Sequence, residues 1–249
     1  MSRRKYGLSF ISDDDFYNHT KTTVEKYRFQ IDLKEFNKNL IDPVKLTFDS
    51  KVYSKDIQSV VESEIIRQID KSNTNHIGYF HQNIFNYIGV GWSVPSNGYD
   101  VENLSNHQYV EMKNKHNTMN SSSAQKTYIK MQNTLLNEPS AECMLVEVIA
   151  RKSQNTDWKA SIDGDSVSHS RIRRISIDKF YELVTGEKDA FKNLCEQLPI
   201  VIEEIVNDIN LDEKSNTVFS ELKQISPNLL KSLYLLSFEK YEGFDNFHV

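Results

Sequence analysis

The chain has 249 residues, of which 38% are hydrophobic, and its formal net charge at pH 7 is −5. This length can bury a sizeable core, and thirteen Phe, twelve Tyr and two Trp exclude a disordered chain. The acidic balance excludes a generally basic nucleic-acid coat, although it allows a local basic surface. There is no apolar run of bilayer length and no signal-peptide core, and Cys143 and Cys195 have no zinc or disulfide pattern, so we expect a reduced, cytoplasmic protein outside the membrane.

The first third of the chain predicts helices. Ser12, followed by three aspartates, is typical of a helix start, and this helix is expected to run toward Phe29. Apolar residues at helical spacing predict a second helix over 55–69 and a third over 77–88. Gly89 is expected to end the third helix.

Residues 98–114 hold the most informative pattern. In a strand, Glu111 and Lys113 alternate with Val110 and Met112 and therefore share one face. A hairpin centred near 103–106 would return Asp100 beside them. Two carboxylates and an ammonium group in a small volume suit a hard divalent cation next to a phosphate. On this pattern alone, a solvated strand face is the alternative, because 26% of the chain is charged.

A polar run and a buried strand follow. Residues 114–123 carry amide, imidazole, hydroxyl and ammonium groups, which are the groups that contact phosphates and base edges; a solvated loop is the alternative. Ser123 is expected to cap a helix, and the apolar run 143–150 predicts a strand buried on both faces. Its one charge, Glu147, is expected to pair with a lysine or to lie at a strand end, with a metal role as the alternative.

The remaining segments complete an α/β pattern. The turn at 163–166 predicts a hairpin, residues 171–177 alternate as a strand, and helical patterns continue to the C-terminus. Three arginines fall within 171–174, and Arg151-Lys152 follows the buried strand. The order of elements predicts a short mixed sheet with helices on its faces and a basic surface within an acidic protein.

Several of these segments resemble a known family. Asp100, then Glu111-Met112-Lys113 on a strand, a helix and a buried strand resemble the PD-(D/E)xK nuclease core. The longer strings 69–83, 111–123 and 172–181 resemble the type II restriction endonucleases that cut GGNCC and GGWCC sites. The position that gives the superfamily its proline is Tyr99 here, a departure that is frequent in these enzymes.

The resemblance covers about residues 8–206. It implies an α/β fold with a PD-(D/E)xK restriction-endonuclease-like core, in which a short mixed β-sheet is flanked by helices and by extra N- and C-terminal helices. We expect residues 1–206 to form one catalytic and DNA-binding endonuclease domain. Residues 207–249 are expected to be a C-terminal helical extension, whether separate or within the same domain.

The resemblance also implies an activity. It implies a homodimeric, Mg²⁺-dependent enzyme that hydrolyses one phosphodiester bond per strand at a short palindromic site in double-stranded DNA, with Mn²⁺ as a substitute. Asp100 and Glu111 would be the metal ligands, and Lys113 would orient or deprotonate the attacking water. Glu64, on the 55–69 helix, is the candidate for an additional catalytic carboxylate, against a solvent-facing helix residue as the alternative. Its neighbour Glu62 is not excluded.

DNA contacts are expected from polar and basic residues near the strand ends. Guanine is best read by Arg or Lys and adenine by Asn or Gln, although the sequence does not separate base contacts from phosphate contacts. The candidates are Asn114, Lys115, His116, Asn117, Asn120, Ser121, Ser122, Gln125, Arg151, Lys152, Arg171, Arg173 and Arg174. Two other functions stay open: a repair or structure-specific nuclease with the same core, and a non-catalytic DNA-binding module whose carboxylates are structural.

Overall fold

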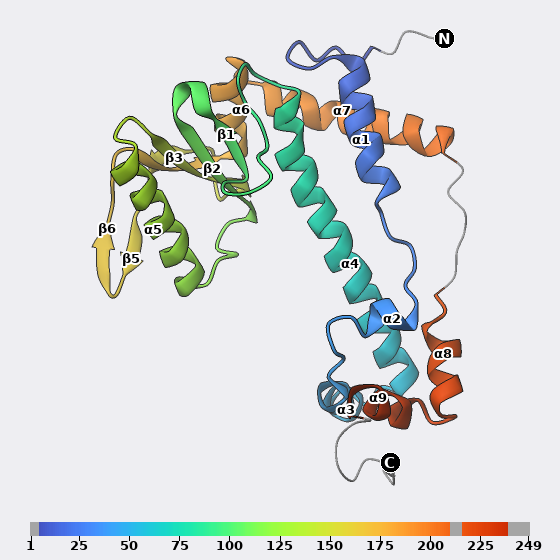
Figure 1. Ribbon diagram of the computed structural model, residues 1–249. Helices are drawn as coiled ribbons and strands as arrows, with labels where there is room; N and C mark the ends of the chain where they lie inside the picture. The colour runs from blue at the N-terminus through green and yellow to red at the C-terminus, as the bar shows by residue number, and fades with distance from the viewer. Residues whose placement is uncertain (1–4, 210–215, 239–249) are drawn as a thin grey trace. The chain divides into compact units, whose positions relative to one another are not determined.

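The computed structural model describes residues 5–209 and 216–238, and these form two compact units (Figure 1). The sheet unit comprises residues 5–25 and 77–209, and the helical unit comprises residues 26–76 and 216–238. This division differs from the predicted boundary after residue 206, because residues 26–76 group with the C-terminal helices. None of the helices in the described ranges is both long enough and apolar enough to cross a bilayer.

The described part of the sheet unit contains a five-stranded sheet in the order β1-β2-β3-β7-β4. Its strands are β1 (Val101–Asn103), β2 (Gln108–Lys115), β3 (Glu142–Ile149), β4 (Asn155–Asp157) and β7 (Ile172–Ser176). β2, β3 and β7 run parallel, whereas β1 and β4 pair antiparallel at the two edges. The predicted short mixed sheet is confirmed, although β4 was not predicted.

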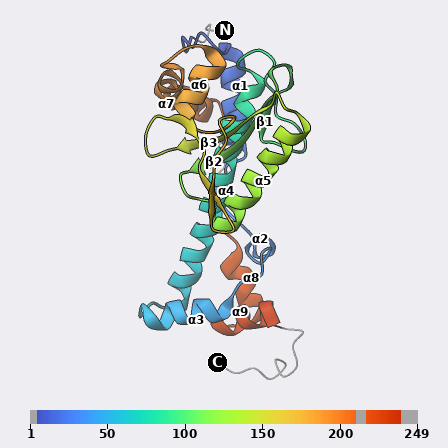
Figure 2. The same ribbon diagram turned by 90° about the vertical axis from the view of Figure 1, so that its left-hand side faces the viewer.

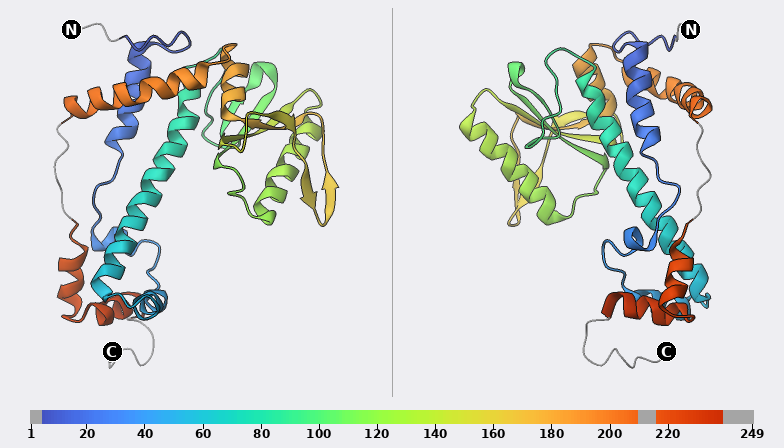
Figure 3. Two further views of the ribbon diagram at one scale, coloured as in Figure 1. Left: turned by 180° about the vertical axis from the view of Figure 1, so that it is seen from behind. Right: turned by 45° about the vertical axis from the view of Figure 1, so that its right-hand side comes forward.

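Two hairpins shape the sheet unit. β1 and β2 are joined by a short 3₁₀ turn (Leu104–Asn106), after which His107 takes a left-handed φ of 55°. β5 (Ala160–Ile162) and β6 (Asp165–Val167) form a separate hairpin that lies beside α5 (Figure 3). Its turn residues, Asp163 and Gly164, have φ values of 51° and 97°, and Asp-Gly is a favoured pair where both turn residues need positive φ.

Helices cover both faces of the sheet (Figure 2). α5 (Ser121–Asn137) packs on one face, and α6 (Ile177–Thr185) and α7 (Ala190–Asp208) lie on the other, together with α1 (Asp13–Glu25) and the last turns of α4 (Ile57–Asn83). In β3, Cys143 and Leu145 pack with α5, whereas Met144 and Val146 pack on the opposite side. This double burial explains the continuous apolar run in β3.

Some of the predicted helix ends agree with the structure and others do not. Ser12 begins α1 as predicted, since its Oγ accepts a hydrogen bond from the backbone N of Asp15 at 3.0 Å. α5 begins earlier than predicted, because Asn120 rather than Ser123 is its cap and accepts from the Ser123 backbone N at 2.8 Å. The two helices predicted over 55–69 and 77–88 are one helix, α4. Residues 70–76 are polar but contain no Gly or Pro that would end it.

The helical unit has its own core. It is built from α2 (Leu33–Phe36), α3 (Pro43–Val52), the first turns of α4, α8 (Val218–Ile225) and α9 (Leu229–Phe238). Phe36, Val61, Leu222 and Leu233 are buried together there. The side chain of Asn216 accepts a hydrogen bond from the Ile31 backbone N at 2.8 Å, which joins the two chain segments of the unit.

Candidate active site

Asp100 is fixed beside β2 by hydrogen bonds across the hairpin. Its backbone N donates to Val110 O at 2.9 Å, and its Oδ2 accepts from the backbone N of Met112 at 2.7 Å. The hairpin therefore returns this carboxylate to the strand that carries Glu111, as the sequence predicts.

Lys113 lies between the two carboxylates. Its Nζ is 3.4 Å from Glu111 Oε2 and 3.9 Å from Asp100 Oδ2. Glu111 and Lys113 are two residues apart in β2 and share the face that α5 covers, where Tyr109 also packs. The structure thus brings together Asp100, Glu111 and Lys113.

The charge of Asp100 is sensitive to its surroundings. Burial raises the pKa of this carboxyl group above its ordinary value, and the neighbouring Glu111 charge acts in the same direction. The hydrogen bond from the Met112 backbone N and the charges of Lys113 and Lys130 oppose the rise. A partly buried carboxylate of this kind gains from any cation placed next to it.

A further lysine reaches the same site from the helix above it. Lys130 of α5 donates a hydrogen bond to Glu111 Oε1 and another to Gly98 O at 2.8 Å. Its Nζ also lies 4.0 Å from the centre of the Tyr99 ring. Lys130 was not predicted as a site residue.

The donor set fits a hard divalent cation. Asp100 and Glu111 offer carboxylate oxygens, and Mg²⁺ usually takes only one or two protein carboxylates while keeping several waters. Over the described residues, no group of three or more His, Cys, Asp or Glu side chains is placed to hold a metal ion. Asp100 and Glu111, which share Lys113 Nζ, are the pair of carboxylates that the sequence predicts as the ligands of such an ion.

A second charged cluster lies further along the same face. Glu147, two residues before the end of β3, is directly opposite Lys113 in the parallel register, and its side chain is only 2% exposed. Its carboxylate bonds to Arg174 of β7 and to the His116 Nδ1 at 3.1 Å. Burial acts to raise the pKa of Glu147, but the bonds from Arg174 and His116 outweigh it and hold the pKa below its ordinary value. Glu147 thus pairs with an arginine and a histidine rather than with the predicted lysine.

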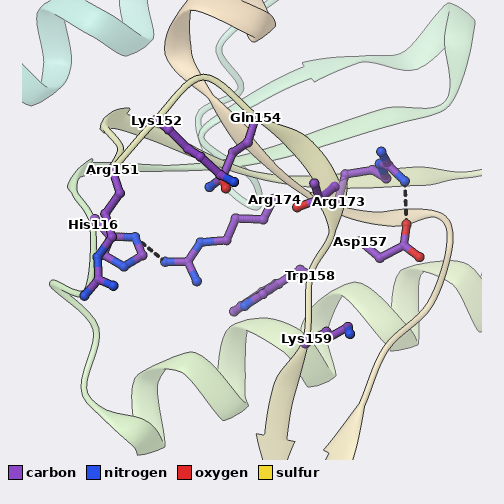
Figure 4. Close-up of a pocket in the computed structure, with 10 residues that line it drawn as sticks. His116, Arg151, Lys152, Gln154, Asp157, Trp158, Lys159, Arg173 and Arg174 are labelled. Atoms are coloured by element: carbon purple, nitrogen blue, oxygen red, sulfur yellow. Dashed lines mark hydrogen bonds and ion pairs between the residues drawn. The ribbon is translucent and has the colours of Figure 1, made fainter.

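A basic pocket adjoins this cluster (Figure 4). Its volume is about 740 Å³, and five of the predicted DNA-contacting residues line it. They are His116, Arg151, Lys152, Arg173 and Arg174. Five residues that were not predicted complete the lining: Gln154, Thr156, Asp157, Trp158 and Lys159.

The two central arginines of the pocket are held by other residues. Arg173 Nε donates to Asn155 Oδ1 at 3.0 Å, its Nη2 donates to Asn155 O at 2.7 Å, and its Nη1 bonds to Asp157. Arg174 points to His116 (Figure 4) and bonds Glu147. By contrast, Arg151 and Lys152 lie in the exposed loop after β3.

Comparison with known proteins shows which family the chain belongs to. The model of the Eco47II restriction endonuclease family matches residues 8–207. The chain belongs to the Eco47II restriction endonuclease family. It is 35% identical over 230 residues to the type II restriction enzyme Sau96I of Staphylococcus aureus, covering 87% of this chain and 88% of that enzyme. It is 31% identical over 214 residues to the type II restriction enzyme Eco47II of Escherichia coli, covering 81% of this chain and 89% of that enzyme.

Membership in the Eco47II family confirms the predicted class of enzyme and its α/β fold.

The predicted DNA contacts outside the pocket are distributed over several elements. Asn120 caps α5, Gln125 donates to Asp163 Oδ1 at 2.9 Å, and Ser121 and Ser122 lie in the exposed first turn of α5. Lys115, the last residue of β2, and Asn117, two residues after it, are exposed, and Arg171 directly precedes β7.

Asn114 has a different neighbour. A Cβ atom added at Gly78 of α4 would lie 3.2 Å from Asn114 Oδ1, so the helix passes close to this side chain. Asn114 and Met112 alternate with Lys113 in β2, and Met112 packs on the face opposite α5. Asn114 therefore lies on the other side of the sheet from Lys113.

Glu64 lies in the helical unit, on the first half of α4. Its carboxylate accepts hydrogen bonds from Arg67 Nε at 2.7 Å and from Gln68 Nε2 at 3.0 Å. Burial raises the pKa of Glu64, and the bonds from Arg67 and Gln68 more than offset this and lower it. A catalytic role for Glu64 stays a prediction, and Glu62, two residues earlier, is exposed.

Proposed function

We propose that this member of the Eco47II family is a type II endonuclease that hydrolyses double-stranded DNA at a short palindromic GC-rich site of the GGNCC or GGWCC type. The observation that carries the proposal is the placement of Asp100 and Glu111 within 4 Å of one nitrogen, Lys113 Nζ. Similarity to Sau96I and Eco47II over most of the chain supports the choice of site.

Asp100 and Glu111 would hold a divalent cation, for which we propose Mg²⁺ with Mn²⁺ as a substitute. When bound, such an ion lowers the pKa of water and polarises a phosphoryl oxygen. Lys113 Nζ orients the attacking water. As the neutral amine it would take the proton of that water, and as the ammonium ion it would neutralise the added negative charge. The bond from the water oxygen to phosphorus forms as the bond from phosphorus to the leaving oxygen breaks.

The basic pocket is the proposed DNA contact beside the catalytic residues. β2 connects the two sites directly, since it carries Glu111 and Lys113 and is followed at once by His116. Lys152 and Arg151 are exposed and suited to phosphate contacts, whereas Arg174 is held in a fixed orientation by Glu147. A palindromic target presents the same half-site twice, so we propose a homodimer with two-fold symmetry.

Digestion of a long DNA tests the proposed function. Purified protein incubated with phage DNA and Mg²⁺ should give discrete bands, and sequencing the fragment ends should return one palindromic motif. Degradation to a smear, or cutting confined to branched substrates, would assign the site to a repair or structure-specific nuclease. DNA binding without cleavage in either Mg²⁺ or Mn²⁺ would assign it to a non-catalytic module.

Asp100→Asn is expected to remove cleavage by removing one metal ligand. The amide keeps the size of the side chain but loses the negative charge, so the rate at fixed Mg²⁺ should fall by about a thousandfold, of the order that a major catalytic group contributes. Single-turnover cleavage across a Mg²⁺ titration measures the effect. An unchanged Mg²⁺ dependence would contradict the role of Asp100.

Lys152→Ala is expected to weaken DNA binding equally at cognate and unrelated sequences. An exposed ammonium at the rim of the pocket suits a phosphate contact, so the slope of log K against log salt concentration should fall by about one. Fluorescence anisotropy at several salt concentrations measures this slope. Lys188→Ala, which removes an exposed lysine outside the pocket, is the control. A loss confined to the cognate site would make Lys152 a base reader instead.

A further inference from the structure

The ammonium group of Lys130 is held by three contacts. Its ammonium group contacts Glu111 Oε1, Gly98 O and the face of the Tyr99 ring. A lysine side chain held in this way loses much of its rotamer freedom, so these contacts must offset that loss. The contacts join α5, the loop before β1, and β2 around a single nitrogen.

The packing of α5 sets the position of this ammonium group. Tyr128 and Met131, on either side of Lys130 in sequence, are fully buried against the sheet. Thr134, one turn after Lys130, bonds through its Oγ1 to the Tyr99 hydroxyl at 2.7 Å. The Tyr99 ring that contacts Lys130 is therefore hydrogen-bonded to the same helix, and this packing fixes the position of Lys130 in the site.

Lys130 and Lys113 divide the Glu111 carboxylate between them. Lys113 lies 3.4 Å from Oε2, and Lys130 bonds Oε1. Two carboxylates, Asp100 and Glu111, thus face two ammonium groups, and the four charges sum to zero. A divalent cation that binds Glu111 must therefore share each carboxylate oxygen of that residue with an ammonium group.

We propose that Lys130 is a second active-site ammonium group that competes with the divalent cation for Glu111. This inference deepens the proposed function and rests on it. With the cation present, the four side chains and the ion carry a net charge of +2, which the phosphates of DNA would balance. Cation binding is then weak without DNA and strengthens with it, and by linkage the cation strengthens DNA binding at the same site.

Direct titration with Mn²⁺ in the absence of DNA tests the proposal. Free Mn²⁺ followed by electron paramagnetic resonance gives its Kd for the full chain without any need for turnover. Lys130→Gln should bind Mn²⁺ about tenfold more tightly than the wild type, because one positive charge a few ångströms from the ion is removed. Lys130→Arg keeps the charge and should retain a Kd near that of the wild type.

Lys126→Gln is the matched control. Lys126 lies one turn earlier on α5 and is exposed, so its removal changes the net charge equally without touching Glu111. Its Kd for Mn²⁺ should stay within about twofold of the wild type, since exposed charges are screened by salt. Circular dichroism of each variant checks that α5 and the sheet are intact.

The double variant Lys130→Gln/Asp100→Asn identifies the site of Mn²⁺ binding. The tighter binding of Lys130→Gln should disappear when Asp100, the other proposed ligand, is also changed. Unchanged or weaker Mn²⁺ binding by Lys130→Gln, or no Mn²⁺ binding by any variant, would overturn the competition. Digestion of DNA by the wild type is read separately. If the wild type cleaves DNA but Lys130→Gln does not bind Mn²⁺ more tightly, the competition alone is refuted. If Lys130→Gln binds Mn²⁺ more tightly but the wild type does not cleave DNA, the proposed function alone is refuted.

Discussion

Lys113→Ala should abolish DNA cleavage and leave sequence-specific DNA binding in place. Lys113 Nζ lies within 4 Å of a carboxylate oxygen of both Asp100 and Glu111, and we propose that the attacking water and the reacting phosphate meet there. Alanine removes the group that orients the water and that either takes its proton as the neutral amine or, as the ammonium ion, balances the charge of the phosphorane-like transition state. The cleavage rate should fall by at least about a thousandfold.

Two assays separate catalysis from binding. Single-turnover cleavage of a cognate duplex with Mg²⁺ gives the rate, and a mobility-shift titration without Mg²⁺ gives the affinity. Lys188→Ala, far from Lys113 in sequence and exposed, should match the wild type in both. Turnover by Lys113→Ala within tenfold of the wild type would remove this lysine from the mechanism.

Glu147→Gln should destabilise the protein strongly. The carboxylate of Glu147 is 2% exposed and bonds Arg174 and His116, so the amide leaves a partly buried guanidinium without its counter-charge. Breaking a buried ion pair by removing one partner costs about 3–5 kcal/mol, and the 23% exposure of Arg174 places the expected loss near 3 kcal/mol. Urea unfolding followed by circular dichroism gives the free energy of unfolding.

Glu142→Gln, at the start of the same strand and partly exposed, is the control and should lower the free energy of unfolding by no more than about 0.5 kcal/mol.

The pH dependence of the free energy of unfolding adds a second check. The pKa of Glu147 is held below its ordinary value of 4.5, so the folded state gains from the ionised group above that pH. The stability gap between wild type and Glu147→Gln should narrow as the pH falls below 4.5 toward the folded-state pKa. A gap that widens in acid would contradict the ion pair.

The local part of this site could be predicted from the sequence. Alternation in β2 is enough to place Glu111 and Lys113 on one face, because the side-chain period of a strand is two. The hairpin that returns Asp100 follows from a polar turn between two short strands. The buried character of β3 follows from its continuous apolar run.

Contacts between distant segments could not be predicted in the same way. Lys130 reaches Glu111 only because of how α5 lies on the sheet, and the single available signal was its position beside the buried Met131. The partners of Glu147 depend on the parallel register of β2, β3 and β7. The grouping of residues 26–76 with the C-terminal helices likewise depends on tertiary packing, which no local pattern encodes.

The most direct test of the central claim is the anomalous scattering of Mn²⁺ in crystals of the wild-type protein. We expect a peak coordinated by carboxylate oxygens of both Asp100 and Glu111, with Lys113 Nζ beside it. Crystals grown at a Mn²⁺ concentration that supports cleavage, but with no peak at this pair or with the two carboxylates pointing apart, would contradict it.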